Sequence, residues 1–89
     1  MDKHWTGVVP VENIDVRVHV TKTTNSKGIV LEWYGIGAPV NEVDKERLLE
    51  ILNNRPVVKT LIGKIRVREV NILEKPFSFV FDGLEKPEF

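Results

Sequence analysis

Apolar and polar residues alternate strictly along residues 14–21, which is the period of a β-strand with one buried face. The core-facing positions are predicted to be Ile14, Val16, Val18 and Val20, and the solvent-facing ones Asp15, Arg17, His19 and Thr21. Turn-forming residues fill 23–28, and alternation resumes from Ile29 to Tyr34. The two segments predict an antiparallel hairpin, and Gly35–Pro39 is expected to end its second strand.

The next segment has the spacing of an amphipathic helix, because its apolar residues recur every three to four positions. Asp44 is predicted to cap the helix, with Val43 before it touching Leu48 as a hydrophobic staple. Asn41 is the competing cap. We therefore expect a helix at about residues 45–53. Its core-facing residues are predicted to be Val43, Leu48, Ile51 and Leu52.

Residues 57–62 fit two structures. Their apolar residues follow the spacing of a short helix that starts after Pro56 and ends before Gly63. The same residues are β-branched, which favours a strand. A strand would form a hairpin through a two-residue turn at Gly63–Lys64, with Lys59 opposite Arg68. The strand is favoured slightly, and the short helix stays open as the alternative.

Three further segments predict strands. In residues 65–73 the apolar positions change from one face of the strand to the other, and a β-bulge near Arg68–Glu69 would restore the alternation. Phe77–Phe81 is a final aromatic strand, and Trp5–Val11 is a first one, where Pro10 suits a sheet edge.

Together these elements predict an α+β fold: a small antiparallel sheet of four to six strands with one main helix packed on one face. Residues 1–89 are expected to form a single small globular domain, with frayed ends at 1–4 and 84–89. A chain of this length can bury one modest core without metal or disulfide, and it contains no cysteine.

Charge is balanced overall but sorted along the chain, since 13 basic residues offset 13 acidic ones. The segment from Arg55 to Arg68 has no acidic residue, and its cations are Arg55, Lys59, Lys64, Arg66 and Arg68. Three of these alternate along a predicted strand and would project together, toward phosphates or an acidic protein patch. The favoured interpretation is a solvated edge strand, where cations discourage aggregation, because the net charge is zero.

Residues suited to chemistry do not form a recognisable set. His4 lies in a segment expected to be loose, and His19 lies on a polar strand face far from it in sequence, which makes a poor metal site. Neither Ser26 nor Ser78 stands in the setting of an activated nucleophile. We therefore expect no catalytic residue, no metal site and no cofactor.

The sequence predicts a non-enzymatic protein-interaction or small accessory module, whose partner is another protein or a second copy of itself. The alternative is a nucleic-acid-associated accessory protein that uses Arg55–Arg68. The candidate interaction surface combines that stretch with three phenylalanines, whose other predicted role is to anchor the core: Phe77, Phe79 and Phe81. No signal peptide or membrane-spanning run is present, so we expect a cytoplasmic protein without a membrane partner.

Overall fold

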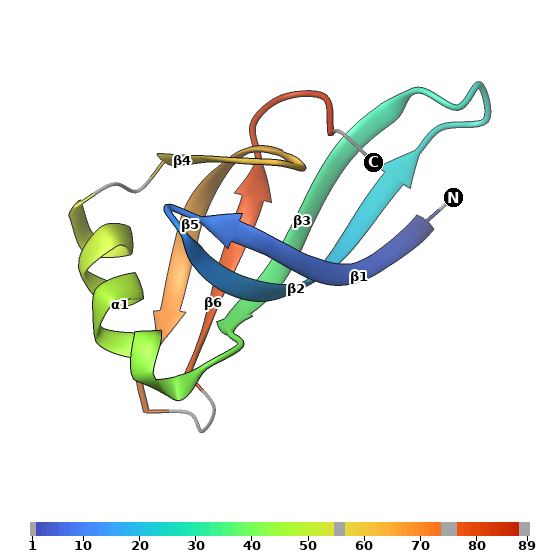
Figure 1. Ribbon diagram of the computed structural model, residues 1–89. Coiled ribbons are helices and arrows are strands. Elements are labelled where there is room, and N and C mark those ends of the chain that lie inside the picture. The colour runs from blue at the N-terminus through green and yellow to red at the C-terminus, as the bar shows by residue number, and fades with distance from the viewer. Residues whose placement is uncertain (1, 55–56, 74–76, 88–89) are drawn as a thin grey trace.

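The computed structural model describes residues 2–54, 57–73 and 77–87 (Figure 1). The elements along the chain are β1 (Asp2–Val11), β2 (Ile14–Thr24), β3 (Val30–Pro39), the short 3₁₀ helix η1 (Glu42–Asp44), α1 (Lys45–Asn54), β4 (Val57–Thr60), β5 (Gly63–Asn71) and β6 (Ser78–Gly83). The strands form one antiparallel sheet in the order β1-β2-β3-β6-β5-β4. The predicted class, α+β with an antiparallel sheet, is confirmed in these broad terms.

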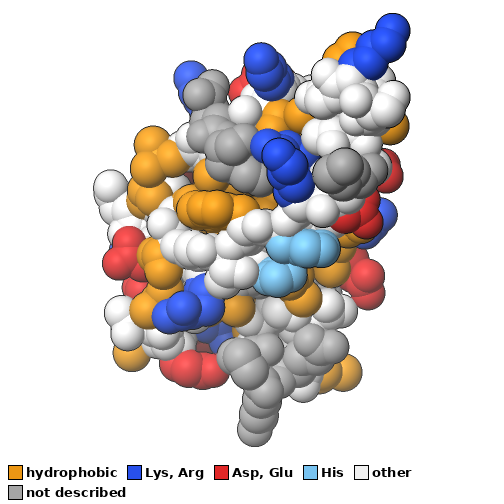
Figure 2. Space-filling model, turned by 90° about the vertical axis from the view of Figure 1, so that its right-hand side faces the viewer, with side chains coloured by type: hydrophobic (Ala, Val, Ile, Leu, Met, Phe, Trp, Pro, Cys, Tyr) orange, Lys and Arg blue, Asp and Glu red, His pale blue; other side chains and the backbone are white. Residues whose placement is uncertain are grey.

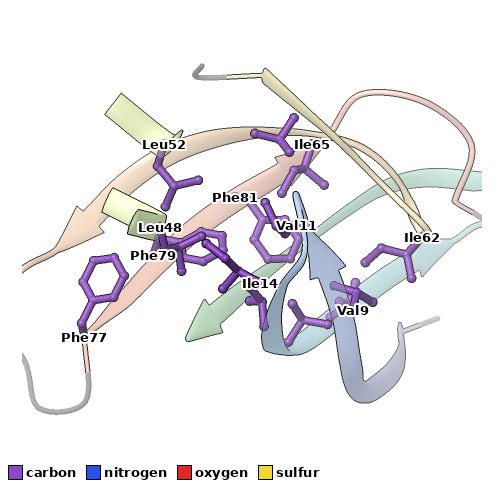
Figure 3. Packing of buried hydrophobic residues seen from close by; sticks show 14 of the residues in the cluster. Val9, Val11, Ile14, Leu48, Leu52, Ile62, Ile65, Phe77, Phe79 and Phe81 are labelled. Atoms are coloured by element: carbon purple, nitrogen blue, oxygen red, sulfur yellow. The ribbon is translucent and has the colours of Figure 1, made fainter. Parts of the chain in front are cut away.

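The sheet curls, so that its two edge strands, β1 and β4, approach each other (Figure 1). Val9 and Val11 of β1 therefore share one hydrophobic cluster with Val58 of β4 and Ile62 of the following turn (Figure 3). The core lies inside the curl, and most of the buried side chains come from the sheet itself. The helix adds Leu48 and Leu52, so the expectation of a helix packed over one sheet face is not confirmed.

Strand β2 follows the predicted alternation, and its four core positions are buried. Thr21 was expected to face solvent but is buried. Its hydroxyl lies 3.1 Å from the Nδ1 atom of His4 on β1, which covers it. The prediction that residues 2–4 are frayed is wrong, because they pair with β2 as part of β1.

Strand β3 continues through Gly35–Pro39, where the sequence predicted its end. The glycines serve close packing rather than a turn. A Cβ atom at Gly37 would lie 2.7 Å from the ring of Phe79, and one at Gly35 would lie 2.8 Å from the ring of Phe81. Glycine lets the two rings of β6 approach the backbone of β3, which a larger residue would prevent.

The predicted helix is confirmed to within a residue, but its predicted cap is not. Helix α1 follows directly on η1, and the Asp44 amide donates to the carbonyl of Asn41 at 3.1 Å. Asp44 thus lies inside the helical segment and does not cap it. Val43 is 89% exposed, so the predicted staple with Leu48 is wrong. The extra 3₁₀ turn places Val43 toward solvent.

Residues 57–60 form a strand, as favoured, but the turn lies elsewhere. Thr60 pairs with Gly63, which makes Leu61 and Ile62 the turn residues and sets Lys59 opposite Lys64. The Thr60 hydroxyl donates to the Gly63 carbonyl at 2.7 Å and accepts from the Ile62 amide at 3.2 Å. These bonds close the turn earlier than the predicted Gly63–Lys64 position.

The predicted β-bulge in β5 is confirmed. Val67 pairs with Phe81 and Glu69 with Val80, so Arg68 is the extra residue. Val67 and Val70 therefore both face the core, although residues three positions apart lie on opposite faces of a regular strand.

The segment after β6 is held in place up to Pro87, contrary to the predicted fraying. The Glu85 carbonyl accepts from Trp33 Nε1 at 2.6 Å, and the Glu85 carboxylate accepts from the Lys64 amide at 3.0 Å. Pro87 is buried. Residues 88–89 lie outside the described part.

Candidate functional site

The outer face of the sheet, turned away from the core, carries polar side chains on β2 and charged ones on β5. On β2 these include Arg17, His19 and Thr23, and on β5 Lys64, Arg66, Arg68 and Glu69. Strand β3 lies between them and differs, because its outward side chains are apolar apart from Glu32, which pairs with Thr23. We call this set the β3 stripe: Ile29, Leu31, Tyr34, Ile36, Ala38 and Val40.

The middle of the β3 stripe follows strand alternation. Gly35 and Gly37 face the core, so Tyr34, Ile36 and Ala38 face outward. Tyr34 is 38% exposed and Ile36 43%.

The end of the stripe near the hairpin depends on a β-bulge. Thr23 pairs with Glu32 and Thr24 with Val30, so Leu31 is the extra residue. The bulge resets the alternation, and Val30 packs against the core. Ile29 and Leu31 are left 58% and 63% exposed.

Two shallow hollows flank Ile36, and His19 lines both. One, of about 210 Å³, is bordered by Thr6, Arg17 and Ala38. The other, of about 240 Å³, is bordered by Tyr34, Arg68 and Val80. Ile36 lines both hollows, together with small residues: Gly37, Ala38 and Ser78 in the first and Gly35 in the second.

The two histidines, distant in sequence, lie side by side on β1 and β2. Their ring centroids are 5.9 Å apart with planes at 19°, and Figure 2 shows both at the surface. The Nδ1 atom of His4 is hydrogen-bonded to the Thr21 hydroxyl at 3.1 Å, and that of His19 to the Thr6 hydroxyl at 2.8 Å. The loose N-terminus predicted for His4 is therefore wrong. Among the described residues no group of three or more His, Cys, Asp or Glu side chains could hold a metal ion.

The basic residues of the predicted surface that the structure describes, namely Lys59, Lys64, Arg66 and Arg68, are all exposed. Near the β3 stripe, the positive charge of these residues is partly balanced by a carboxylate. Asp82 of β6 pairs in register with both Tyr34 and Arg66, and its carboxylate lies 3.6 Å from the Arg68 guanidinium. Arg55 lies outside the described residues.

The aromatic half of the predicted surface lies in the core. Phe77, Phe79 and Phe81 are fully buried, in one hydrophobic cluster with Leu48 and Leu52 of α1 (Figure 3). The rings of Phe79 and Phe81 are 5.9 Å apart, and Trp33 meets Phe81 edge-on at 6.5 Å. These residues take the core role, and the folded chain does not expose them to a partner.

The predicted strand ended at Tyr34, so the outward positions of Ile36 and Ala38 beyond it were missed. The signal was present in the alternation of glycine with larger residues across Gly35 and Gly37, which continues the strand. No family model, curated protein or solved structure matches the chain. Functional inference therefore rests on the outer face itself.

No helix among the described residues is both long enough and apolar enough to cross a membrane.

Proposed function

We propose that the protein is a non-enzymatic protein-interaction module that docks a protein partner on the β3 stripe. One observation carries the proposal: apart from Glu32, the central strand exposes apolar side chains on its outer face, while neighbouring β2 exposes polar ones. Where one face of a sheet is in contact with water, the side chains on that face are normally polar. Contiguous exposed apolar surface rimmed by polar residues is typical of interaction sites.

The composition of the surface supports the same proposal. Ile36 and Tyr34 lie at its centre, and Arg17, Arg66 and Arg68 surround them. Tyrosine and arginine are enriched at protein interfaces, where an apolar centre is enclosed by a polar rim. The hollows beside Ile36 are smaller than the roughly 300 Å³ at which small-molecule pockets begin, so single side chains of a partner suit them better.

A second candidate, nucleic-acid binding, is favoured by one observation. Exposed Tyr34 lies on the same face as Arg66 and Arg68, which places an aromatic ring beside cations as in single-strand binding surfaces. Asp82 lies between them and pairs with Arg68. We therefore place this candidate second.

Photo-crosslinking in living cells tests the proposal. A benzophenone-bearing residue at Ile36 should give discrete protein adducts, while the same residue at Glu46, exposed on α1, should not. Leu31→Lys, at the far end of the stripe, should remove the Ile36 adducts without changing the circular dichroism spectrum. Adducts that are equal at both positions, or that survive Leu31→Lys, would count against the stripe as a docking surface.

A further inference from the structure

We infer that the partner docked on the β3 stripe is a second copy of this chain, related by a two-fold axis. The inference rests on the proposed function, because it uses the same surface and names its occupant. Two arguments lead to it, one from the area of the stripe and one from the charges around it.

The area of the stripe together with the strands on either side of it reaches what a specific dimer needs. The span from Ile29 to Val40 is about 35 Å long at about 3.3 Å per residue, and with its neighbouring strands it is about 14 Å wide. That product is about 500 Å² per copy, or about 1,000 Å² for two copies, which is the lower limit for a specific interface. The dimer should therefore be weak, with a dissociation constant in the micromolar range.

Charges around the stripe suit its own copy better than a strongly charged partner. Arg17, Arg66 and Arg68 are offset by three carboxylates on the same face, those of Glu32, Glu69 and Asp82. A surface built for a partner of opposite charge would show one sign, whereas this rim shows both. The chain as a whole has a net charge of zero, so two copies do not repel each other at long range.

Two-fold symmetry makes the contact self-limiting. In an isologous interface the same patch is used on both copies, so one contact closes the dimer and leaves no stripe exposed. Ile36 lies near the middle of the stripe, and the axis therefore brings the two Ile36 side chains near each other. A charge introduced at position 36 therefore lies close to the same charge on the other copy of the chain.

Sedimentation of the purified chain tests the inference. The wild type should approach twice 10.2 kDa between about 1 and 100 µM. Ile36→Lys and Ile36→Asp should each raise the dissociation constant at least about tenfold, because like charges are desolvated against each other. An equimolar mixture of the two variants should recover the dimer, since opposite charges then meet.

Leu61→Lys is the control, because Leu61 is an exposed apolar residue in the β4–β5 turn, away from the stripe. It should leave the dissociation constant within about twofold of the wild-type value. A wild-type monomer at 100 µM that still gives Ile36 adducts to another protein would overturn the second copy and keep the proposed function. A dimer insensitive to Ile36→Lys, or a mixture that stays monomeric, would overturn the stripe-to-stripe arrangement.

Discussion

Burial differs sharply between two apolar residues at the helix, although the sequence pattern assigned both to the core. Leu52 is buried inside the curl of the sheet, whereas Val43 is exposed on η1. Leu52→Ala should lower the free energy of unfolding by about 2–5 kcal/mol, because it removes buried methyl groups and leaves a cavity. Val43→Ala should change it by less than about 0.5 kcal/mol. Urea denaturation measures both, and equal effects would contradict the assigned burial.

Individual residues also show why local pattern has limits. Gly35 and Gly37 were interpreted as strand breakers, since glycine favours turns. Their role is to admit the rings of Phe81 and Phe79, which lie on a strand more than 40 residues away. The local alternation of glycine with larger residues fits a strand as well as a turn, and the packing between these distant segments decides between the two. The same error hid Ile36, because a strand that stops at Tyr34 has no outward-facing residue there.

Strand β5 offers a test of how a bulge sets the faces of an element. Deleting Arg68, the extra residue, should leave the protein folded, because Val67 and Val70 keep their inward positions on a regular strand. Deleting Arg66 should cost at least about 3 kcal/mol, because any realignment turns Ile65 or Val67 outward and a cation inward. Each deletion removes one exposed arginine, so the net charge changes equally.

Thermal unfolding followed by circular dichroism compares the two deletions. A larger loss of melting temperature for the Arg68 deletion than for the Arg66 deletion would show that the bulge is required for the curl of the sheet.

Elements with an unbroken local period were predictable from the sequence. Strand β2, helix α1 and the bulge in β5 each repeat or reset a pattern within a short window, and all three are confirmed. The β4–β5 turn was misplaced because two turns fit the same residues, and the Thr60 hydroxyl favours one through its bonds to Gly63 and Ile62. That Lys64 and Arg66 lie on one face was predictable from their spacing of two residues. Which strands lie beside β5 was not predictable.

The whole molecule combines a neutral net charge with four exposed cations on the neighbouring strands β4 and β5. Lys59 and Lys64 lie opposite each other on β4 and β5, where like charges weaken the pairing slightly. Short β4 is an edge strand, and cations on an edge oppose its pairing with other chains. The arginines nearer the β3 stripe lie beside Asp82 instead. The cations therefore divide between edge protection and the rim of the stripe.

This division predicts weak affinity for nucleic acid. If Lys64, Arg66 and Arg68 contacted three phosphates of duplex DNA, the logarithm of the binding constant would fall with that of salt with a slope of roughly −2.7. We expect no measurable binding near physiological salt, because Asp82 and Glu69 lie among these cations and the net charge is zero. Fluorescence anisotropy of labelled single-stranded and duplex oligonucleotides over a salt series measures it. The triple alanine variant at these positions is compared with one at Lys3, Lys27 and Arg47, three exposed cations elsewhere. Submicromolar, salt-sensitive binding that only the first variant loses would favour the nucleic-acid function over protein docking on the stripe.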